Sequence, residues 1–178
     1  MGRATAILAF TVFTALCVAT AGAFAQAKKV RPATKTVSLK PVAAWTFTRE
    51  LGAPTLAYGI KAEEDLQISF SCQPDSGLLR VISLIGSRGL HPGDGAAIRL
   101  RNGKAYFEIA GTAFSTEMRK QVDVAGTTKF DAALFDLLRQ GEKAILEVPG
   151  HRRSLTLNNA KAATEAFEKA CARTRSSK

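Results

Sequence analysis

The dipeptide Asn102-Gly103 lies between two stretches in which apolar and polar residues alternate, and it constrains the fold more than any other local feature of the chain. Asn-Gly favours a two-residue type I′ turn, and the alternating flanks favour two antiparallel strands. A turn at this dipeptide predicts one apolar and one mostly polar face. The predicted opposing pairs are Leu100 with Ala105, Ile98 with Phe107 and Ala96 with Ile109 on the apolar face, and Arg99 with Tyr106 and Ala97 with Glu108 on the polar face.

Further strands are predicted ahead of this hairpin, at residues 45–49, 55–60, 66–72 and 78–85. Residues 66–72 alternate apolar with polar side chains, as a strand with one buried face does. Residues 78–85 are apolar on both parities except at Arg80 and Ser83, which is typical of a central strand covered on both faces. This part of the chain is therefore predicted to be mostly sheet.

A second hairpin is predicted around Pro149-Gly150. A loop over residues 149–152 sets Leu146 opposite Leu155, and Ala144 opposite Leu157. A two-residue loop instead sets Leu146 opposite Arg153. We predict the longer loop, because it pairs apolar residues with apolar residues on one face.

One helix is predicted between the two hairpins. Thr128 and Asp131 form a variant of the capping box at its start, and Gly141 stands where a helix C-cap is expected. The apolar residues of this segment share one face of a helix. They are Phe130, Leu134, Leu137 and Leu138.

An alanine-rich segment that ends in Cys171 predicts a second helix, with Asn158 or Asn159 as its N-cap. Many strands and only two helices indicate a mainly β (α+β) fold. We predict an antiparallel β-sandwich-like domain with one internal helix and a C-terminal helix.

Residues 1–25 have the features of an export signal. Arg3 supplies a positive charge, residues 6–19 are uncharged and mostly apolar, and Ala23-Phe24-Ala25 has the small residues that signal peptidase recognises. Cleavage after Ala25 would leave a chain that begins at Gln26, and a site after Ala27 fits almost as well. The apolar stretch is too short for a stable membrane anchor. We expect a periplasmic or secreted protein.

Removal of the signal takes Cys17 with it and leaves Cys72 and Cys171. Two cysteines in an oxidising compartment predict one disulfide. Cys72 falls on the apolar parity of its strand, and Cys171 lies on the same helix face as Phe167, so both should point inward. The alternative to the disulfide is a pair of buried free thiols. Cys17 could instead be a site of lipid attachment, but the bulky Leu16 before it disfavours this.

The chain of 178 residues carries a formal net charge of +10. Its predicted organisation is a signal peptide over residues 1–25, a basic proline-containing leader over 26–44, a single β-rich domain over 45–172 and a frayed tail over 173–178. The leader has basic residues and no acidic one, so its counter-charges in an exported protein would be anionic lipids, lipopolysaccharide or wall polymers. Alternatively, the leader is a solvated linker.

Motifs for metal, cofactor or catalytic chemistry are missing from the sequence. His91 and His151 are far apart and lie in no metal-ligand spacing, and no nucleophile motif occurs. The acidic cluster at residues 63–65 is interpreted as a solvated loop, and the glycine-rich segment 86–95 as a long, mobile connection. We therefore predict no metal site, no cofactor, no catalytic residue and no enzymatic activity.

A cationic group around the Asn-Gly turn is the candidate anion-binding site. Its residues are Arg99, Arg101, Lys104 and Tyr106. Further positive side chains occur at Arg119-Lys120 and at His151-Arg152-Arg153. The sequence does not say whether these groups converge.

The order of these features resembles a known family. Trp45, a strand ending in Cys72, a helix over Phe130–Arg139, the hairpin at Pro149-Gly150 and an alanine-rich helix ending in Cys171 are similar to small exported proteobacterial proteins of the invasion-associated locus B type. The resemblance implies a compact β-rich periplasmic domain without enzymatic activity, linked to envelope integrity or host interaction. It carries no catalytic residues.

The functional hypothesis is an exported, non-enzymatic binding or assembly module of the envelope. We expect its partner to be an envelope protein or an anionic envelope polymer, with no nucleic acid, no more than peripheral membrane contact and an oligomeric state that the sequence does not define. One alternative is a hydrolase acting on wall or glycan, which would need paired carboxylates within about 10 Å of each other. Another is direct binding of lipopolysaccharide or another polyanion.

Overall fold

The computed structural model describes residues 42–49, 53–60, 65–73, 76–117 and 119–175. They belong to one compact unit that begins at Leu39. The predicted signal peptide, Cys17, and the leader up to residue 41 lie outside the described residues, as does the tail beyond Arg175. Within the described part of the chain, no helix is long and apolar enough to cross a membrane.

The described strands pair into one sheet in which every neighbouring pair is antiparallel. The sheet order is β1-β2-β3-β4-β7-β6-β5-β8-β9. The strands are β1 (Ala44–Thr48), β2 (Thr55–Ile60), β3 (Asp65–Cys72), β4 (Leu78–Ser87), β5 (Gly95–Asn102), β6 (Ala105–Thr116), β7 (Arg119–Lys129), β8 (Lys143–Val148) and β9 (His151–Thr156). The predicted mainly β fold class is confirmed.

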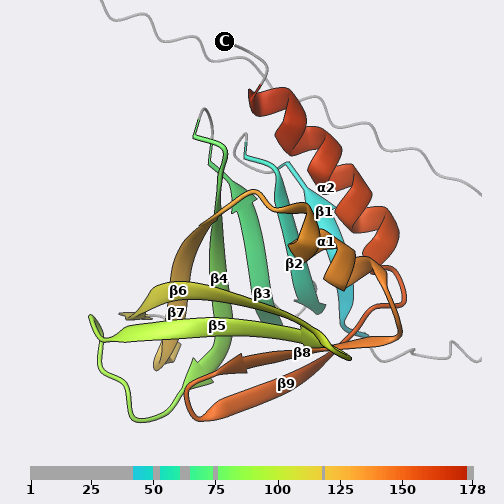
Figure 1. Cartoon of the computed structure of the whole chain (residues 1–178). Coiled ribbons are helices and arrows are strands. Elements are labelled where there is room, and N and C mark those ends of the chain that lie inside the picture. The colour runs from blue at the N-terminus through green and yellow to red at the C-terminus, as the bar shows by residue number, and fades with distance from the viewer. Residues whose placement is uncertain (1–41, 50–52, 61–64, 74–75, 118, 176–178) are drawn as a thin grey trace, which may run out of the picture. The chain divides into compact units, whose positions relative to one another are not determined.

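The sheet folds over on itself. Figure 1 shows β1, β2, β3 and β4 standing side by side, while β5, β6, β8 and β9 run across them. At the β6–β7 pairing, Gly111 lies opposite Gly126. A Cβ atom at Gly111 would lie 2.3 Å from the backbone oxygen of Ala125, and one at Gly126 would lie 2.5 Å from that of Ala110. Glycine is therefore required at both positions, because the two backbones approach too closely for a side chain.

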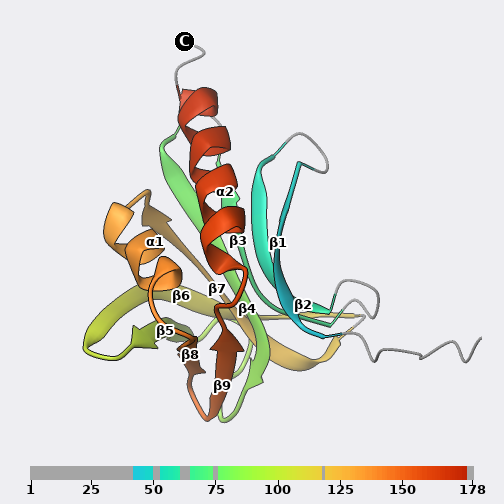
Figure 2. The same ribbon diagram turned by 90° about the vertical axis from the view of Figure 1, so that its right-hand side faces the viewer.

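Two helices complete the core, α1 (Ala132–Arg139) and α2 (Ala160–Arg175). Both lie on the same side of the sheet, and α2 runs along β1 and β2 (Figure 2). The largest buried side chains come from both parts of the sheet and from both helices. They are Trp45, Phe70, Phe135, Phe167, Leu56, Ile68, Leu79, Ile98, Leu100, Ile109, Leu134 and Leu138.

Helix α1 begins one turn later than the capping-box prediction places it. Its N-cap is Asp131, whose side chain accepts a hydrogen bond of 2.8 Å from the backbone N–H of Ala133. Thr128 still belongs to β7, so its predicted capping role is wrong. Gly141 follows the C-cap with a φ of +71°, as expected for a helix end.

Helix α2 begins directly after Asn159 and continues to Arg175, which is three residues into the segment predicted to fray. Its buried face includes Phe167 and Cys171, as predicted. Phe167 packs on Phe135 of α1, with 5.7 Å between the ring centroids.

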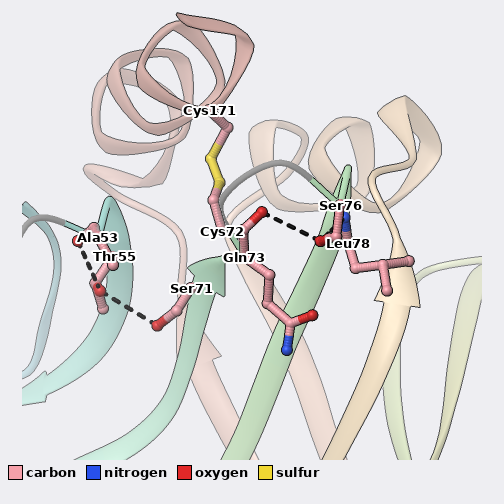
Figure 3. Close-up of a disulfide and its surroundings, with 8 residues drawn as sticks. All are labelled: Ala53, Thr55, Ser71, Cys72, Gln73, Ser76, Leu78 and Cys171. Atoms are coloured by element: carbon pink, nitrogen blue, oxygen red, sulfur yellow. Dashed lines mark hydrogen bonds between the residues drawn. A yellow bond between two sulfur atoms is a disulfide. The ribbon is translucent and has the colours of Figure 1, made fainter. Parts of the chain in front are cut away.

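A disulfide joins Cys72, the last residue of β3, to Cys171 in α2 (Figure 3). The predicted pairing is therefore confirmed, and both residues are buried, with exposed fractions of 5% and 1%. A bond across 99 residues stabilises the fold by roughly 4–5 kcal/mol in the chain-entropy model. The bond is also compatible with an oxidising, exported location.

The turn of the Asn102-Gly103 hairpin lies one residue further along the chain than predicted. The structure pairs Asn102 with Ala105, Leu100 with Phe107 and Ile98 with Ile109, so the two turn residues are Gly103 and Lys104. The predicted faces survive, because moving the turn by one residue shifts each partner by two and preserves its parity.

The shift places Asn102 at the end of helix α1. Its side-chain Nδ2 donates a hydrogen bond of 2.8 Å to the backbone oxygen of Leu137, and a second one to that of Gln140. These carbonyls belong to the last turn of the helix, where no intrahelical donor is left for them. Gly103 supplies the positive φ, at +59°, that a two-residue hairpin turn requires.

The second hairpin has the shorter loop, so the prediction of a loop over residues 149–152 is wrong. Val148 pairs with His151, and Leu146 pairs with Arg153. The prediction assumed that the whole face around Leu146 is apolar. In the structure, Arg153 instead lines a polar pocket beside β4.

Both ends of β9 are hydrogen-bonded to residues of the first four strands, β1–β4. At its start, His151 Nδ1 lies 2.9 Å from the backbone oxygen of Ile85. At its end, the backbone N–H of Thr156 donates to the hydroxyl of Tyr58 over 3.1 Å, and its carbonyl accepts from Trp45 Nε1 over 2.9 Å. These bonds bring the two edges of the folded sheet together.

The glycine-rich segment 86–95, predicted to be a mobile connection, is bonded to its surroundings. The backbone N–H of Gly93 donates to Ala113 in β6, and the N–H of Ala113 donates back to Asp94, both over 2.8 Å. The backbone N–H of Arg88 donates to Pro149 over 3.0 Å. The segment is thus joined to β6 and to the β8–β9 turn.

Candidate functional site

The predicted anion-binding residues all lie on the exposed surface of the β5–β6 hairpin. Arg101 lies directly opposite Tyr106, and its guanidinium carbon is 5.4 Å from the centroid of the Tyr106 ring. This is the distance of a cation–π contact. Lys104 is at the turn. The structure therefore groups Arg99, Arg101, Lys104 and Tyr106 on one hairpin.

Glu108 is a member of this group that the sequence analysis missed. Arg99 Nε lies 2.6 Å from Glu108 Oε2, and the hydroxyl of Tyr106 also donates to that oxygen. The hydrogen bond from Tyr106 and then the one from Arg99 lower the pKa of Glu108. The predicted register paired Glu108 with Ala97, whereas the structure sets it opposite Arg99.

The outward face carries a row of alternating charges across four strands. Arg99 of β5 lies between Glu108 of β6 and Glu147 of β8, and Glu147 lies opposite Arg152 of β9. Arg152 Nε is 3.3 Å from Glu147 Oε1. Opposite charges on directly facing strand positions attract each other, although exposed pairs contribute little to stability.

Arg99 and the tip of the second hairpin line one open pocket of about 350 Å³, here called the outer pocket. Its walls are Arg99, Glu147, Val148, Pro149, Gly150, His151 and Arg152. Arg99 of the first hairpin and Arg152 of the second, about fifty positions apart in the sequence, therefore converge on one pocket. The sequence analysis had left that convergence open.

A second polar pocket is built around an irregularity of β4. The pairing of β4 with β7 is regular up to Ser83 and resumes at Ser87, so the intervening residues form a bulge. Asp123 Oδ1 accepts the backbone N–H of Gly86 over 3.1 Å. Arg119 and Gln121 both donate to the carbonyl of Leu84, over 2.9 and 3.0 Å. Side chains of β7 thus satisfy backbone groups that the bulge leaves unpaired.

Asp123 is only 2% exposed. Burial raises the pKa of its carboxyl group, even though Arg119, the N–H of Gly86 and Gln121 each lower it. Arg119 Nε lies 3.2 Å from Asp123 Oδ2. The carboxylate is therefore compensated by one cation and by two neutral donors, as a buried charge requires.

The space beside this network is a pocket of about 170 Å³, here called the bulge pocket. Its walls come from β3, β4, β7 and β9, and they are Asp65, Gln67, Leu84, Ile85, Arg119, Gln121 and Arg153. Arg119 and Arg153 thus converge as well. Lys120 lines a separate open pocket with Arg119 and Gln121.

Among the described residues, these pockets contain neither a group of metal ligands nor a pair of carboxylates. Within the part of the chain that the structure describes, no three His, Cys, Asp or Glu side chains are grouped to hold a metal ion. The outer pocket and the bulge pocket each have one lining carboxylate, Glu147 and Asp65 respectively. Glu63 and Glu64 of the predicted acidic cluster lie outside the described residues.

No family model, no curated protein and no solved structure matches this chain.

Proposed function

We propose that this chain is an exported, non-enzymatic binding module of the cell envelope. Three features support export: the signal-like residues 1–25, the disulfide between Cys72 and Cys171, and the resemblance to small exported proteins of the invasion-associated locus B type. The same resemblance supports a role in envelope integrity or host interaction.

We infer that the ligand is an anionic envelope component and that it binds to the outward face of β5, β6, β8 and β9. The observation that carries this inference is the convergence of Arg99 and Arg152 on the outer pocket. Arg101 and Lys104 of the same hairpin extend the positive surface. Phosphate and carboxylate groups of envelope polymers are the complementary chemistry.

The ion pairs of this face leave donors for such a ligand. Arg99 contacts Glu108 through Nε, and Arg152 contacts Glu147 through Nε. A guanidinium has five N–H donors, four of which are on its two terminal nitrogens. Glu108 and Glu147 therefore orient the guanidinium groups, whose terminal nitrogens can still bind an anion.

The test is salt-dependent binding of the mature chain to immobilised lipopolysaccharide and to vesicles of anionic phospholipid. Binding should weaken steeply as salt rises, because exposed charges are screened over about 8–10 Å at ordinary ionic strength. Replacing Arg99, Arg101 and Lys104 with Ser should remove most of it. Arg80→Ser is the control, since Arg80 is exposed on β4, which is not one of these four strands.

The outcomes separate the possible binding elements. Loss of binding in the triple variant and not in Arg80→Ser supports the outward face. Binding that survives in the triple variant and disappears when residues 28–40 are deleted assigns the ligand to the leader. If neither change matters, the polyanion proposal is wrong and a protein partner bound through apolar contacts replaces it.

A further inference from the structure

The bulge pocket contains two opposite charges that do not neutralise each other. Arg119, the other charged residue of its wall, is already paired with Asp123. Asp65 and Arg153 both line the pocket, yet no salt bridge joins them, and neither makes an ion pair with any described residue. Their charged atoms are therefore more than 4 Å apart on the walls of one cavity.

One hydrogen-bond acceptor in the wall of the pocket also lacks a partner. Gln67 Oε1 is buried and has no hydrogen-bond partner. The amide nitrogen of Gln121 is engaged, because it donates to Leu84 and to Asp123. An acceptor that is buried without a donor costs free energy, and because this oxygen is closed to solvent, a ligand in the pocket reaches it only if the Gln67 side chain turns.

We propose that the bulge pocket binds a small zwitterion, of the class of free α-amino acids. The carboxylate of the ligand faces the guanidinium of Arg153. Its ammonium group faces the carboxylate of Asp65.

Charge and size both favour a zwitterion over a simple anion. A lone carboxylate would engage Arg153 and be repelled by Asp65, whereas a zwitterion pairs with both. A cavity of about 170 Å³ is smaller than the roughly 300–1,000 Å³ of pockets for drug-sized ligands. It therefore suits a molecule with few atoms.

One wall of the pocket is preorganised. Arg119 and Gln121 are held against the β4 bulge by the carbonyl of Leu84 and by Asp123. The ligand therefore does not have to order these two side chains, which favours binding.

The test is calorimetric titration of the mature chain with each of the common L-amino acids. Each one that binds is compared with its two halves, the carboxylic acid without the amino group and the amine without the carboxyl group. For L-alanine these are propanoate and ethylamine. Each half should bind about tenfold more weakly or worse, because it loses one charge-assisted hydrogen bond.

Substitutions locate the site. Arg153→Gln and Asp65→Asn should each weaken binding of the amino acid about tenfold or more, and Gln67→Leu should weaken it less. Arg152→Gln is the control, because Arg152 is the neighbouring residue of β9 and lines the outer pocket instead. Unchanged thermal unfolding of each variant shows that the fold is intact.

Three results would overturn the proposal. The first is that no amino acid binds at millimolar concentration. The second is that propanoate binds as tightly as alanine, which would make the pocket a simple anion site. The third is that Arg153→Gln and Asp65→Asn both bind normally. None of these results bears on lipopolysaccharide binding by the outward face, so the two proposals fail independently.

Discussion

The side chain of Asn159 occupies the free edge of β1 by bonding to both backbone groups of Trp45. Its Oδ1 accepts from the N–H of Trp45 over 3.1 Å, and its Nδ2 donates to the carbonyl of Trp45 over 2.7 Å. The amide thus replaces a residue of a neighbouring strand. An edge strand with unpaired backbone groups invites pairing with other chains, and this contact protects β1 at that residue.

Asn159→Ala should therefore destabilise the protein by about 1–3 kcal/mol, because two hydrogen bonds are lost. Asn158→Ala is the matched control and should change stability by less than about 0.5 kcal/mol, since Asn158 is exposed like Asn159 but makes no hydrogen bond to Trp45. Urea unfolding measures both. Equal losses at the two positions would show that the bonds to Trp45 contribute nothing.

Asn102 offers a test of the hairpin register. In a type I′ turn, Asp is accepted nearly as well as Asn at the first central position. In the structure, Asn102 donates to two carbonyls at the end of α1. Asn102→Asp should then cost about 1–3 kcal/mol, because a carboxylate cannot donate and is repelled by the negative end of the helix. A neutral effect of Asn102→Asp in urea unfolding would instead support the turn position predicted from the sequence.

The two faces of the same hairpin should differ in their tolerance of alanine. Phe107 packs against the core, whereas Tyr106 is 49% exposed. Phe107→Ala should cost roughly 2–4 kcal/mol, which is below the value for a fully buried ring because Phe107 is only partly buried. Tyr106→Ala should cost less than about 1 kcal/mol. If thermal and urea unfolding gave the opposite order, the assignment of the faces would be wrong.

The raised pKa of Asp123 predicts a pH dependence of stability. Its ordinary pKa is 3.8, and burial raises it in the folded protein. The folded carboxyl group then binds a proton more readily than the unfolded one, so its contribution to the free energy of unfolding falls as pH rises from about 4 to the raised pKa. Above that pKa the contribution is constant.

Asp123→Asn isolates this group. The variant lacks the titration, so the difference in unfolding free energy, wild type minus variant, should grow as the pH is lowered from 7 towards 4. Urea unfolding at several pH values measures it. A difference that shrinks on acidification would mean that the ion pair with Arg119 outweighs burial and lowers the pKa.

Local patterns were enough to predict the fold class, the two faces of the first hairpin and the disulfide. Alternation determines which side of a strand faces the core, and that parity is unchanged when a turn moves by one residue, as it does at Gly103. The position of the turn itself was not predictable from the dipeptide. It depends on the contact of Asn102 with α1, which only the tertiary structure brings together.

The candidate pockets could not be predicted from the sequence for a related reason. Arg153 lies on the apolar parity of β9, and its pairing with Leu146 was rejected because it sets a charged residue opposite an apolar one. Asp123 also gave no signal, since a single aspartate in an alternating strand is typical of a solvated face. Both residues acquire their roles from strands that are distant in the sequence and meet only when the sheet folds over.

Export is the central claim, because the proposed envelope ligand depends on it and the disulfide is compatible with it. Its most direct test is the intact mass, without reduction, of the protein recovered separately from the cytosol, the periplasm and the medium of its native host. We predict a chain that begins at Gln26, or at Lys28 if cleavage follows Ala27, with no free thiol at Cys72 or Cys171. A chain found in the cytosol with residues 1–25 retained and both thiols free would contradict export, and a lipid adduct on Cys17 would mean membrane anchoring in place of a free periplasmic or secreted chain.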